Sequence, residues 1–274
     1  MSISVLILTL NEEINLPACL ETVSWSDDIV VFDSYSTDRT VAIAQQAGAK
    51  VVQRRFDNWS AHQNWVVEHI QFKHPWVFYT DADERCDQEL KNELQDIGVF
   101  GEAFSAFQIR RKDYFMGKWL KHAQLYPTWL TRVFRPEKIR YERLVNPVAI
   151  VEGKTGQLKG HIDHFPFSHG ISHWFDRHNK YSSLEAKDFV NEITVKSDWK
   201  GILSNSATHR RKAIKHLAYK LPFRPILILG YLMFIRGAFL DGMPGIHYSF
   251  MRSIYEYIID LKVTELNFHR KIVK

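Results

Sequence analysis

The first 80 residues alternate short apolar runs with longer stretches whose apolar residues recur at helical spacing. Four of the runs are rich in β-branched and aromatic residues and have the length of strands. Strands that alternate with helices in this way predict an α/β fold, in which helices cover both faces of a mostly parallel sheet. The predicted strands are Ile3–Thr9, Ile29–Phe32, Lys50–Gln53 and Trp76–Tyr79.

Polar clusters follow three of these predicted strands, at the point where each strand ends. They are residues 9–12, 33–38 and 80–84. Because ligands of open parallel sheets bind beyond the carboxyl ends of the strands, we expect the three clusters to form one site. The glycine-rich phosphate-binding motifs of dinucleotide oxidoreductases and P-loop enzymes do not occur in the sequence, which argues against both classes.

The triplet Asp81-Ala82-Asp83 is the most informative part of these clusters. Two carboxylates placed two residues apart after a buried strand can reach a hard divalent cation, or a ribose hydroxyl together with a cation. A cation in this position would neutralise the charge that develops on a departing diphosphate. Such a triplet also occurs in solvated loops, but its place beside two further polar strand ends favours a functional site.

The same clusters carry a family resemblance. Residues 4–12, 33–40 and 80–84 resemble motifs of the family 2 glycosyltransferases in order and spacing, and the resemblance runs through roughly residues 1–190. It implies the GT-A fold, and within the family it is most similar to bacterial enzymes that build lipopolysaccharide core, capsule or exopolysaccharide. The implied reaction is an inverting, metal-dependent transfer of a sugar from a nucleotide-diphosphate donor, a UDP-sugar, to a glycan or lipid-linked acceptor.

The resemblance also implies roles for individual residues. A Mn²⁺ or Mg²⁺ ion would bind Asp83, Asp81 would face the ribose, and Asp33 would contact the base. The residues implied to bind the nucleotide-sugar are Thr9, Leu10, Asn11, Glu12, Asp33, Asp81 and Asp83.

The catalytic base is the part of the implied site where this sequence departs from the family. Inverting transfer needs a group that takes the proton from the attacking hydroxyl. Where relatives carry this base in a His-Glu or Glu-Asp motif, this chain has Val145-Asn146. Glu142 is the nearest carboxylate and therefore the candidate base, but Arg140 and Arg143 beside it suit a surface ion pair equally well. An acceptor with an ionised phosphate, such as polyprenyl phosphate, would need no base.

Other polar residues have structural alternatives. Asp38 and Thr40 suit a helix cap and its first turn, and Glu84 suits the start of the next helix. Arg132 is expected either to clamp phosphate or to lie in solvent. His164 belongs to a histidine-rich stretch without zinc-ligand spacing, and the resemblance makes it a candidate for contact with the diphosphate.

The composition changes near residue 196. Residues 196–224 hold eight Lys or Arg and a single acid, and an apolar stretch follows directly. We therefore expect a catalytic domain over 1–195, with a nucleotide-sugar half at about 1–100 and an acceptor half at about 101–195. Residues 196–274 would form a basic, amphipathic helical region whose residues 196–245 bind an anionic membrane surface. The alternative is a helix packed on the catalytic domain or in the interface of a homo-oligomer.

Composition limits the other classes. Two cysteines among 274 residues are too few for a disulfide framework and fit a reducing compartment. A net charge of +5 without a recognised binding motif predicts no nucleic-acid partner. Because no secretory signal or long apolar span is apparent, we expect a cytoplasmic protein, peripheral or monotopic on the inner face of a bacterial inner membrane. Nucleotidyl transfer and a non-catalytic, membrane-bound glycan-binding or scaffold role are the remaining rivals.

Overall fold

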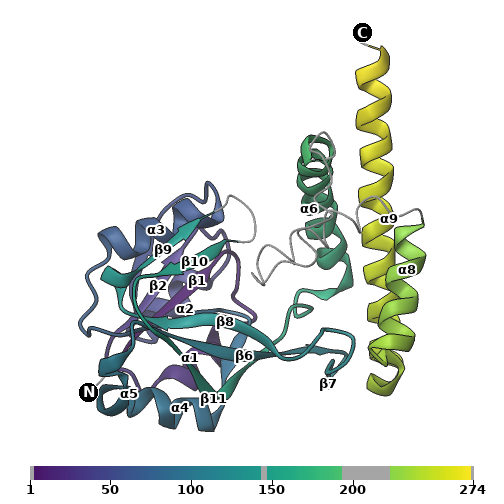
Figure 1. Ribbon diagram of the computed structural model, residues 1–274. Helices are drawn as coiled ribbons and strands as arrows, with labels where there is room; N and C mark the ends of the chain where they lie inside the picture. The colour runs from purple at the N-terminus through teal and green to yellow at the C-terminus, as the bar shows by residue number, and fades with distance from the viewer. Residues whose placement is uncertain (1–2, 143–146, 193–222, 273–274) are drawn as a thin grey trace. The chain divides into compact units, whose positions relative to one another are not determined.

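The computed structural model describes residues 3–142, 147–192 and 223–272 (Figure 1). The chain divides into two compact units. The first consists of Met1–Tyr114 and Tyr126–Ser168, and the second of Phe115–Leu125 and His169–Lys274. The predicted domain boundary at residue 195 lies outside the described residues and stays a prediction.

A mixed sheet forms the centre of the first unit. Over the described residues its strands follow the order β3-β2-β1-β4-β8-β6-β11-β5. The four N-terminal strands are parallel to one another, as expected from the alternating pattern, and β8 then pairs antiparallel with β4. The strands of this order are β1 (Ser4–Thr9), β2 (Ile29–Asp33), β3 (Lys50–Gln53), β4 (Val77–Asp81), β5 (Glu84–Cys86), β6 (Ala106–Phe115), β8 (Thr128–Phe134) and β11 (Thr155–His164).

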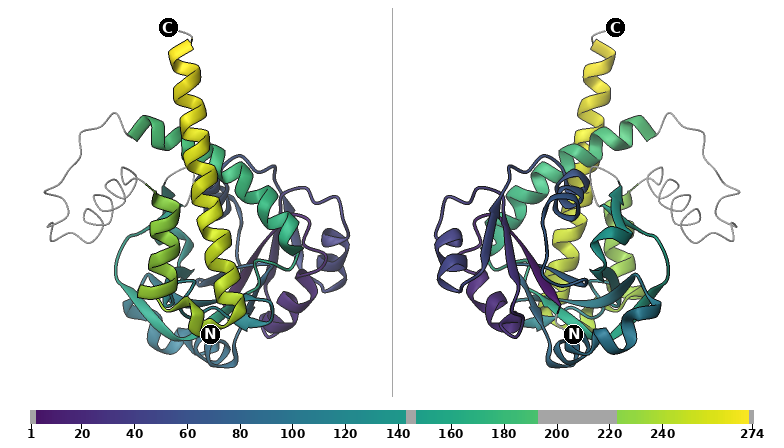
Figure 2. Two further views of the ribbon diagram at one scale, coloured as in Figure 1. Left: turned by 90° about the vertical axis from the view of Figure 1, so that its right-hand side faces the viewer. Right: turned by 90° about the vertical axis from the view of Figure 1, so that its left-hand side faces the viewer.

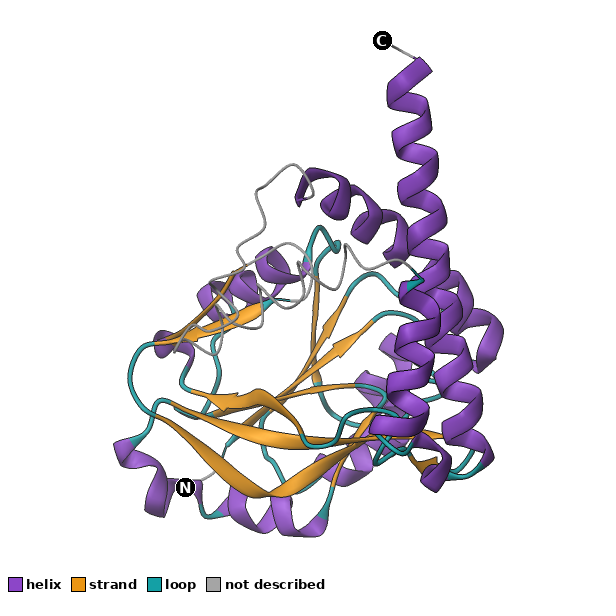
Figure 3. Ribbon diagram, turned by 45° about the vertical axis from the view of Figure 1, so that its right-hand side comes forward, coloured by secondary structure: helices purple, strands orange, loops and turns teal. Residues whose placement is uncertain are grey.

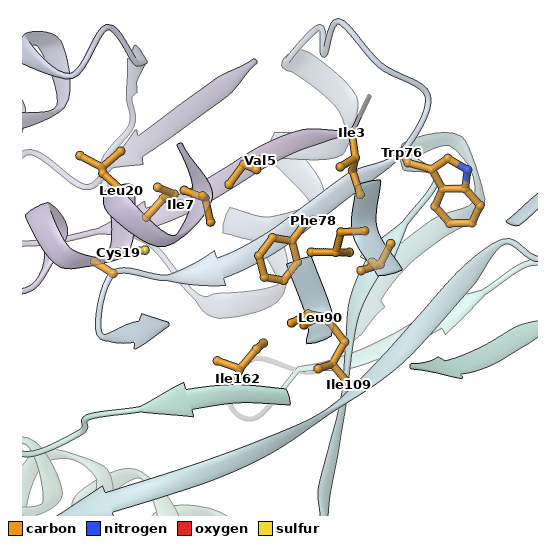
Figure 4. Packing of buried hydrophobic residues seen from close by; sticks show 14 of the residues in the cluster. Ile3, Val5, Ile7, Cys19, Leu20, Trp76, Phe78, Leu90, Ile109 and Ile162 are labelled. Atoms are coloured by element: carbon orange, nitrogen blue, oxygen red, sulfur yellow. The ribbon is translucent and has the colours of Figure 1, made fainter. Parts of the chain in front are cut away.

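Helices and a small ribbon cover the two faces of this sheet. Alternation along β1 sends Val5 and Ile7 into one apolar cluster and Leu6 and Leu8 into the other. Figure 4 shows the first cluster, where Cys19 and Leu90 pack from helices against the strands. The covering elements are α1 (Leu16–Val23), α2 (Thr40–Gln46), α3 (Trp59–His69), α4 (Gln88–Gln95), α5 (Ile97–Phe100), η1 (Gly101–Ala103), η2 (Pro136–Lys138) and the ribbon of β9 (Ile139–Glu142) with β10 (Val148–Val151).

The second unit is mainly helical (Figure 3). Helices α6 and α8 both pack against the 30-residue helix α9 (Figure 2). The Arg224 guanidinium is buried between α8 and α9, where Nη2 lies 3.0 Å from the carboxylates of both Glu256 and Asp260. The elements of this unit are β7 (Lys118–Trp119), α6 (Gly170–Glu192), α8 (Arg224–Gly230), η4 (Tyr231–Ile235), η5 (Ala238–Asp241) and α9 (Met243–Ile272).

The expected α/β fold and its C-terminal helical region are thus confirmed over the described residues. The helices described are all too short or too polar to span a bilayer. The basic segment 196–222 lies outside the described residues.

Candidate functional site

The three polar clusters meet at one edge of the sheet. Thr9 on β1 lies in register with Asp33 on β2, and Leu8 lies in register with Asp81 on β4. Since β1 is the middle strand of these three parallel strands, their carboxyl ends bring the predicted nucleotide-binding residues side by side. The expected convergence of the clusters is therefore confirmed.

Asp33 is fully buried at the centre of this edge. Its carboxylate accepts hydrogen bonds from the Thr9 hydroxyl at 3.0 Å, from the Ser36 amide at 2.9 Å and from Nε2 of Gln53 at 2.9 Å. It also accepts one from the Ser36 hydroxyl. Asp33 thus joins β1, β3 and the loop after β2, and its contact with a nucleobase stays a prediction.

Asn11 links the loops that follow β1 and β2. Its Oδ1 accepts a hydrogen bond from the Thr37 amide at 2.8 Å, and its own amide donates to the Ser36 hydroxyl at 2.8 Å. The Asn11 φ of 57° lies in the left-handed region, which asparagine tolerates better than most residues. Leu10 and Asn11 are exposed and Glu12 is half-buried, so this loop is accessible at the edge of the sheet.

Arg132 lies between the carboxylate of Asp81, in the Asp81-Ala82-Asp83 triplet, and that of Glu84, the residue after the triplet. Its Nη2 lies 2.7 Å from Oδ2 of Asp81 and 2.7 Å from Oε1 of Glu84, and its guanidinium carbon lies 4.1 Å from the centre of the Tyr79 ring. The Tyr79 hydroxyl donates to the other oxygen of Asp81 at 2.9 Å. The Asp81 carboxylate is therefore fixed in orientation while 30% of its side chain stays exposed.

Burial dominates the electrostatics of this group. The Glu84 side chain is fully buried, and desolvation raises the pKa of its carboxyl although Arg132 opposes the rise. Desolvation lowers the pKa of the Arg132 guanidinium, but Asp81 and Glu84 raise it more, so this pKa lies well above its ordinary value. Arg132 accordingly stays charged.

Two expectations about these residues were wrong. Glu84 does not begin a helix: it is the first residue of β5, and α4 begins at Gln88 with Asp87 accepting a hydrogen bond from the Leu90 amide at 2.8 Å. Arg132 neither lies in solvent nor is free to clamp a phosphate, because both carboxylates engage it in the interior.

Asp83 lies beside His164, the last residue of β11. Nε2 of His164 is 3.3 Å from Oδ2 of Asp83, and Nδ1 is 2.5 Å from Oδ1 of the buried Asp113 on β6. The Phe165 amide also donates to the Asp83 carbonyl at 2.9 Å. Burial lowers the pKa of His164, but Asp83 and Asp113 raise it more, to about 9.

This donor set fits a divalent cation that is shared with a substrate and that displaces the proton held on the His164 imidazole. A carboxylate and an imidazole meet at one point, and a second carboxylate orients the imidazole from behind, as in many protein metal sites. The described residues contain no cluster of three or more His, Cys, Asp or Glu that could hold a metal ion by itself. A cation bound here would therefore take further ligands from water and from substrate phosphates, as Mg²⁺ commonly does.

The sequence analysis did not predict that Asp113 and Arg132 are buried and ion-paired. Asp113 belongs to β6 and Arg132 to β8, and in such strands the sequence does not distinguish a buried charged residue from an exposed one. The histidine-rich stretch gave a signal for His164, but none for the carboxylate behind it.

Glu142 ends β9 and is exposed over 55% of its side chain. Its Oε1 lies 3.2 Å from Nη2 of Arg140, the ion pair considered as its alternative role. Val145 and Asn146, which replace the His-Glu motif, lie outside the described residues. The role of Glu142 as a base stays a prediction.

Comparison with known proteins agrees with the geometry. Residues 4–161 match the family model described as Glycosyl transferase family 2. The chain belongs to this family, and it is therefore a glycosyltransferase that uses a nucleotide-sugar donor.

Relatives are similar over different lengths. The lipopolysaccharide core biosynthesis glycosyltransferase LpsC of Rhizobium meliloti (strain 1021) is 26% identical over 272 residues, which cover 96% of this chain and 92% of the relative. Glycosyltransferase RT0209 of Rickettsia typhi is 27% identical over 69% of this chain and 68% of its own.

Two solved structures are also similar. Residues 1–349 of S. aureus TarS are 14% identical with a TM-score of 0.41, covering 97% of this chain and 92% of that one. Glucosyl-3-phosphoglycerate synthase from Mycobacterium tuberculosis, in complex with Mn²⁺, UDP and phosphoglyceric acid, is 22% identical with a TM-score of 0.34 over 42% of this chain and 44% of that one.

Proposed function

We propose that this glycosyltransferase is an inverting enzyme that moves a sugar from a UDP-sugar onto a glycan or lipid-linked acceptor, with the help of a divalent cation. The observation that carries the proposal is the 3.3 Å approach of His164 Nε2 to Asp83 Oδ2, next to the converged ends of β1, β2 and β4. Without a metal-ligating pair at this place, the polar strand ends would fit a nucleotide-binding protein without transfer activity equally well.

Asp83 and His164 would hold Mn²⁺ or Mg²⁺ in this proposal. The cation would neutralise the charge that develops on the departing diphosphate. Asp113 would keep the imidazole in one orientation through the 2.5 Å contact with Nδ1.

The nucleoside would lie along the edge formed by the first three parallel strands. Asp81, held by Tyr79 and Arg132, would present its exposed carboxylate edge to the ribose hydroxyls. Asp33 would contact the base together with the loop after β2, which Asp33 orders through its hydrogen bonds with Ser36. The remaining lining residues in this proposal are Thr9, Leu10, Asn11 and Glu12.

Glu142 would act as the base that takes the proton from the acceptor hydroxyl. For this role the Glu142 carboxylate would have to leave the Arg140 guanidinium, now 3.2 Å away, and contact the acceptor hydroxyl instead. This ion pair equally favours a second candidate function, transfer to polyprenyl phosphate, whose ionised oxygen needs no base. A comparison of glycan and lipid-phosphate acceptors separates the two.

The product in this proposal belongs to a bacterial surface polysaccharide, with lipopolysaccharide core as the first choice. Similarity to LpsC extends over 96% of this chain, beyond the residues that match the family model, and supports this choice. An assay with core oligosaccharide acceptors of graded length would test it.

A membrane surface near the acceptor is also part of the proposal. The described residues that follow the basic segment expose apolar side chains that a water-soluble surface rarely carries in such number. They are Phe223, Ile226, Leu227, Tyr231, Phe234, Ile235, Phe239 and Leu240. Insertion of this face into the inner leaflet, on the cytoplasmic side, would be strengthened by basic residues before it.

The decisive experiment measures UDP release from purified protein with UDP-sugars and an acceptor extract. We expect turnover that requires Mn²⁺ or Mg²⁺ and stops with a chelator. Asp83→Ala and Asp83→Asn should lose transfer while circular dichroism shows that the fold is kept. Glu137→Ala, which removes an exposed carboxylate of η2, is the control. A fully active Asp83→Asn enzyme would refute the metal-assisted mechanism.

A further inference from the structure

Helix α9 has two apolar faces, and the rest of the second unit covers one of them. Tyr255, Ile259 and Val263 are buried on the covered face. The opposite face, which we call the outer seam, consists of eight residues that run along most of the helix. These are Met243, His247, Phe250, Ile254, Tyr257, Leu261, Thr264 and Phe268.

The outer seam is exposed along its whole length. Its six apolar side chains are exposed over 45% to 61%, although they include two phenylalanines and a tyrosine. In the described part of the unit, the last turns of α9 extend past both α6 and α8 (Figure 2). Six large apolar side chains exposed along one face of a helix mark a surface that another molecule covers.

The spacing of the seam favours a second helix as that molecule. Successive members alternate between steps of four and three residues, which is the heptad repeat of a two-helix seam. At a rise of 1.5 Å per residue the seam is roughly 38 Å long. An apolar stripe only two positions wide per heptad is narrower than the face with which a helix lies on a bilayer.

Charge near the seam also argues against lipid as its occupant. Between Met243 and Phe268, the described basic side chains are Arg252 and Lys262, and both are engaged on the covered side, by Glu256 and by Asn179. The acidic residue Glu265 is exposed beside the seam instead, whereas Asp260 is paired with Arg224 on the covered side. An anionic membrane would find no cation there to attract it.

We propose that the occupant is the outer seam of a second copy of this chain, running antiparallel. In this arrangement every seam residue meets one from the opposite half of the other copy. The four pairs, each formed twice, are Met243 with Phe268, His247 with Thr264, Phe250 with Leu261, and Ile254 with Tyr257. The two polar members of the seam thus meet each other, and every apolar member meets an apolar one.

A parallel pair would be less favourable. It would set His247 of one copy against His247 of the other, because like positions face each other across a parallel seam, and the imidazole would lack the Thr264 hydroxyl as a neighbour. The antiparallel arrangement instead places His247 beside Thr264 of the second copy.

Sedimentation equilibrium of the full chain tests the proposal. We expect a dimer, and we expect Ile254→Lys and Leu261→Lys to give monomers with unchanged circular dichroism, since both side chains are exposed. Phe234→Asp, an exposed apolar residue outside the seam, is the matched control and should remain dimeric. A monomeric wild-type chain, or a dimer that survives both lysine substitutions, would overturn the proposal.

Cross-linking tests the orientation. A mixture of Phe250→Cys and Leu261→Cys chains should form an intermolecular disulfide on mild oxidation. Phe250→Cys alone should not, because an antiparallel seam sets the two copies of this position roughly 16 Å apart along the helix axis. The unsubstituted chain, with Cys19 buried and Cys86 partly buried, is the control.

Two outcomes would contradict this arrangement. Efficient cross-linking of Phe250→Cys alone would show that the two helices do not run antiparallel in the stated register. The second outcome is a Leu261→Lys chain that loses vesicle binding while its molar mass in sedimentation equilibrium stays that of the wild type. That result would assign the seam to lipid and would also overturn the proposal.

Discussion

Nε2 of His164 lies 3.3 Å from Oδ2 of Asp83, although 80 residues separate the two in the sequence. The pairing of β5 with β11 brings them together, since His164 stands in register with Glu84, the neighbour of Asp83. On the other side, β11 is parallel to β6, and this pairing sets His164 opposite Asp113. The imidazole is therefore held between two carboxylates that come from different parts of the sheet.

Asp113→Asn should weaken metal binding without removing a metal ligand. Losing the charge behind a ligating histidine typically costs 10- to 100-fold in metal affinity, and we expect about that loss for Mn²⁺. The measurement is calorimetric titration of Mn²⁺ in the presence of UDP. Asp163→Asn is the control, because Asp163 lies near another histidine, 3.3 Å from His161 Nε2. Equal affinities in the two variants would contradict a positioning role for Asp113.

Arg132→Met should destabilise the first unit. The substitution leaves the buried carboxylate of Glu84 and the partly exposed one of Asp81 without their cation, and breaking a buried pair such as Arg132 with Glu84 costs about 3–5 kcal/mol. Arg140→Met removes an arginine from an exposed pair with Glu142 and should change stability by less than about 1 kcal/mol. Urea unfolding of both variants compares the two. Similar losses would show that Arg132 is not the structural cation inferred from its burial.

Glu142→Gln should lower turnover far more than donor affinity. A general base contributes about 10²- to 10⁴-fold to rate, whereas the amide keeps the shape of the side chain. Glu152 is the matched control, since it too is exposed and ion-paired, with Lys138 at 3.0 Å. Steady-state kinetics and UDP titration separate the two effects. Turnover that equals that of Glu152→Gln would exclude Glu142 as the base and favour an ionised acceptor.

His62 should make stability sensitive to acid. Its ring is buried against Phe32, Nδ1 lies 3.1 Å from Nη1 of Arg54, and Nε2 lies 3.3 Å from the Ser34 hydroxyl. Burial first and the Arg54 charge second lower the pKa of His62 from 6.5 to about 4, while Asp57 opposes them.

The folded protein therefore resists protonation of His62 and the unfolded chain accepts it. The contribution of the neutral ring is fully present above pH 6.5 and is lost as the pH falls toward 4. Chemical unfolding over this range should show a steeper fall for the wild type than for His62→Gln, which does not titrate. Parallel curves for the two proteins would show that this histidine does not govern the acid response.

Phe234→Asp and Ile226→Asp should each weaken vesicle binding. Both side chains are largely exposed, and withholding one large apolar side chain from a bilayer costs about 1.5–3 kcal/mol, which is roughly tenfold or more in partitioning. Flotation with vesicles of anionic phospholipid measures the effect. Leu261→Lys, which alters α9 instead, should bind vesicles as the wild type does. Unchanged flotation of both aspartate variants would contradict the proposed membrane face.

Local patterns were enough to predict the N-terminal half of the sheet. The predicted strands agree with β1 to β4 within two residues at each end, because buried parallel strands are short apolar runs between clear turns. The convergence of residues 9–12, 33–38 and 80–84 followed from strand direction alone. These predictions needed only neighbouring residues and the general rules of α/β sheets.

The mixed half of the sheet could not be predicted in this way. Arg132 reaches Asp81 only because β8 pairs antiparallel with β4 across 50 residues of sequence, and no local pattern encodes that register. Glu84 looked like an acid at a helix start, but its strand is defined by a partner near residue 163. Buried charges in long strands depend on contacts that a sequence pattern does not contain.

The row formed by Glu84, His164 and Asp113 across three neighbouring strands also bears on how such an enzyme can diversify. Backbone ladders, which tolerate little change, set the spacing of this row. Connections between the strands lie outside the row and can lengthen or change composition without disturbing it. New sugar acceptors can therefore be acquired by exchanging loops, while the spacing of these three side chains is inherited intact.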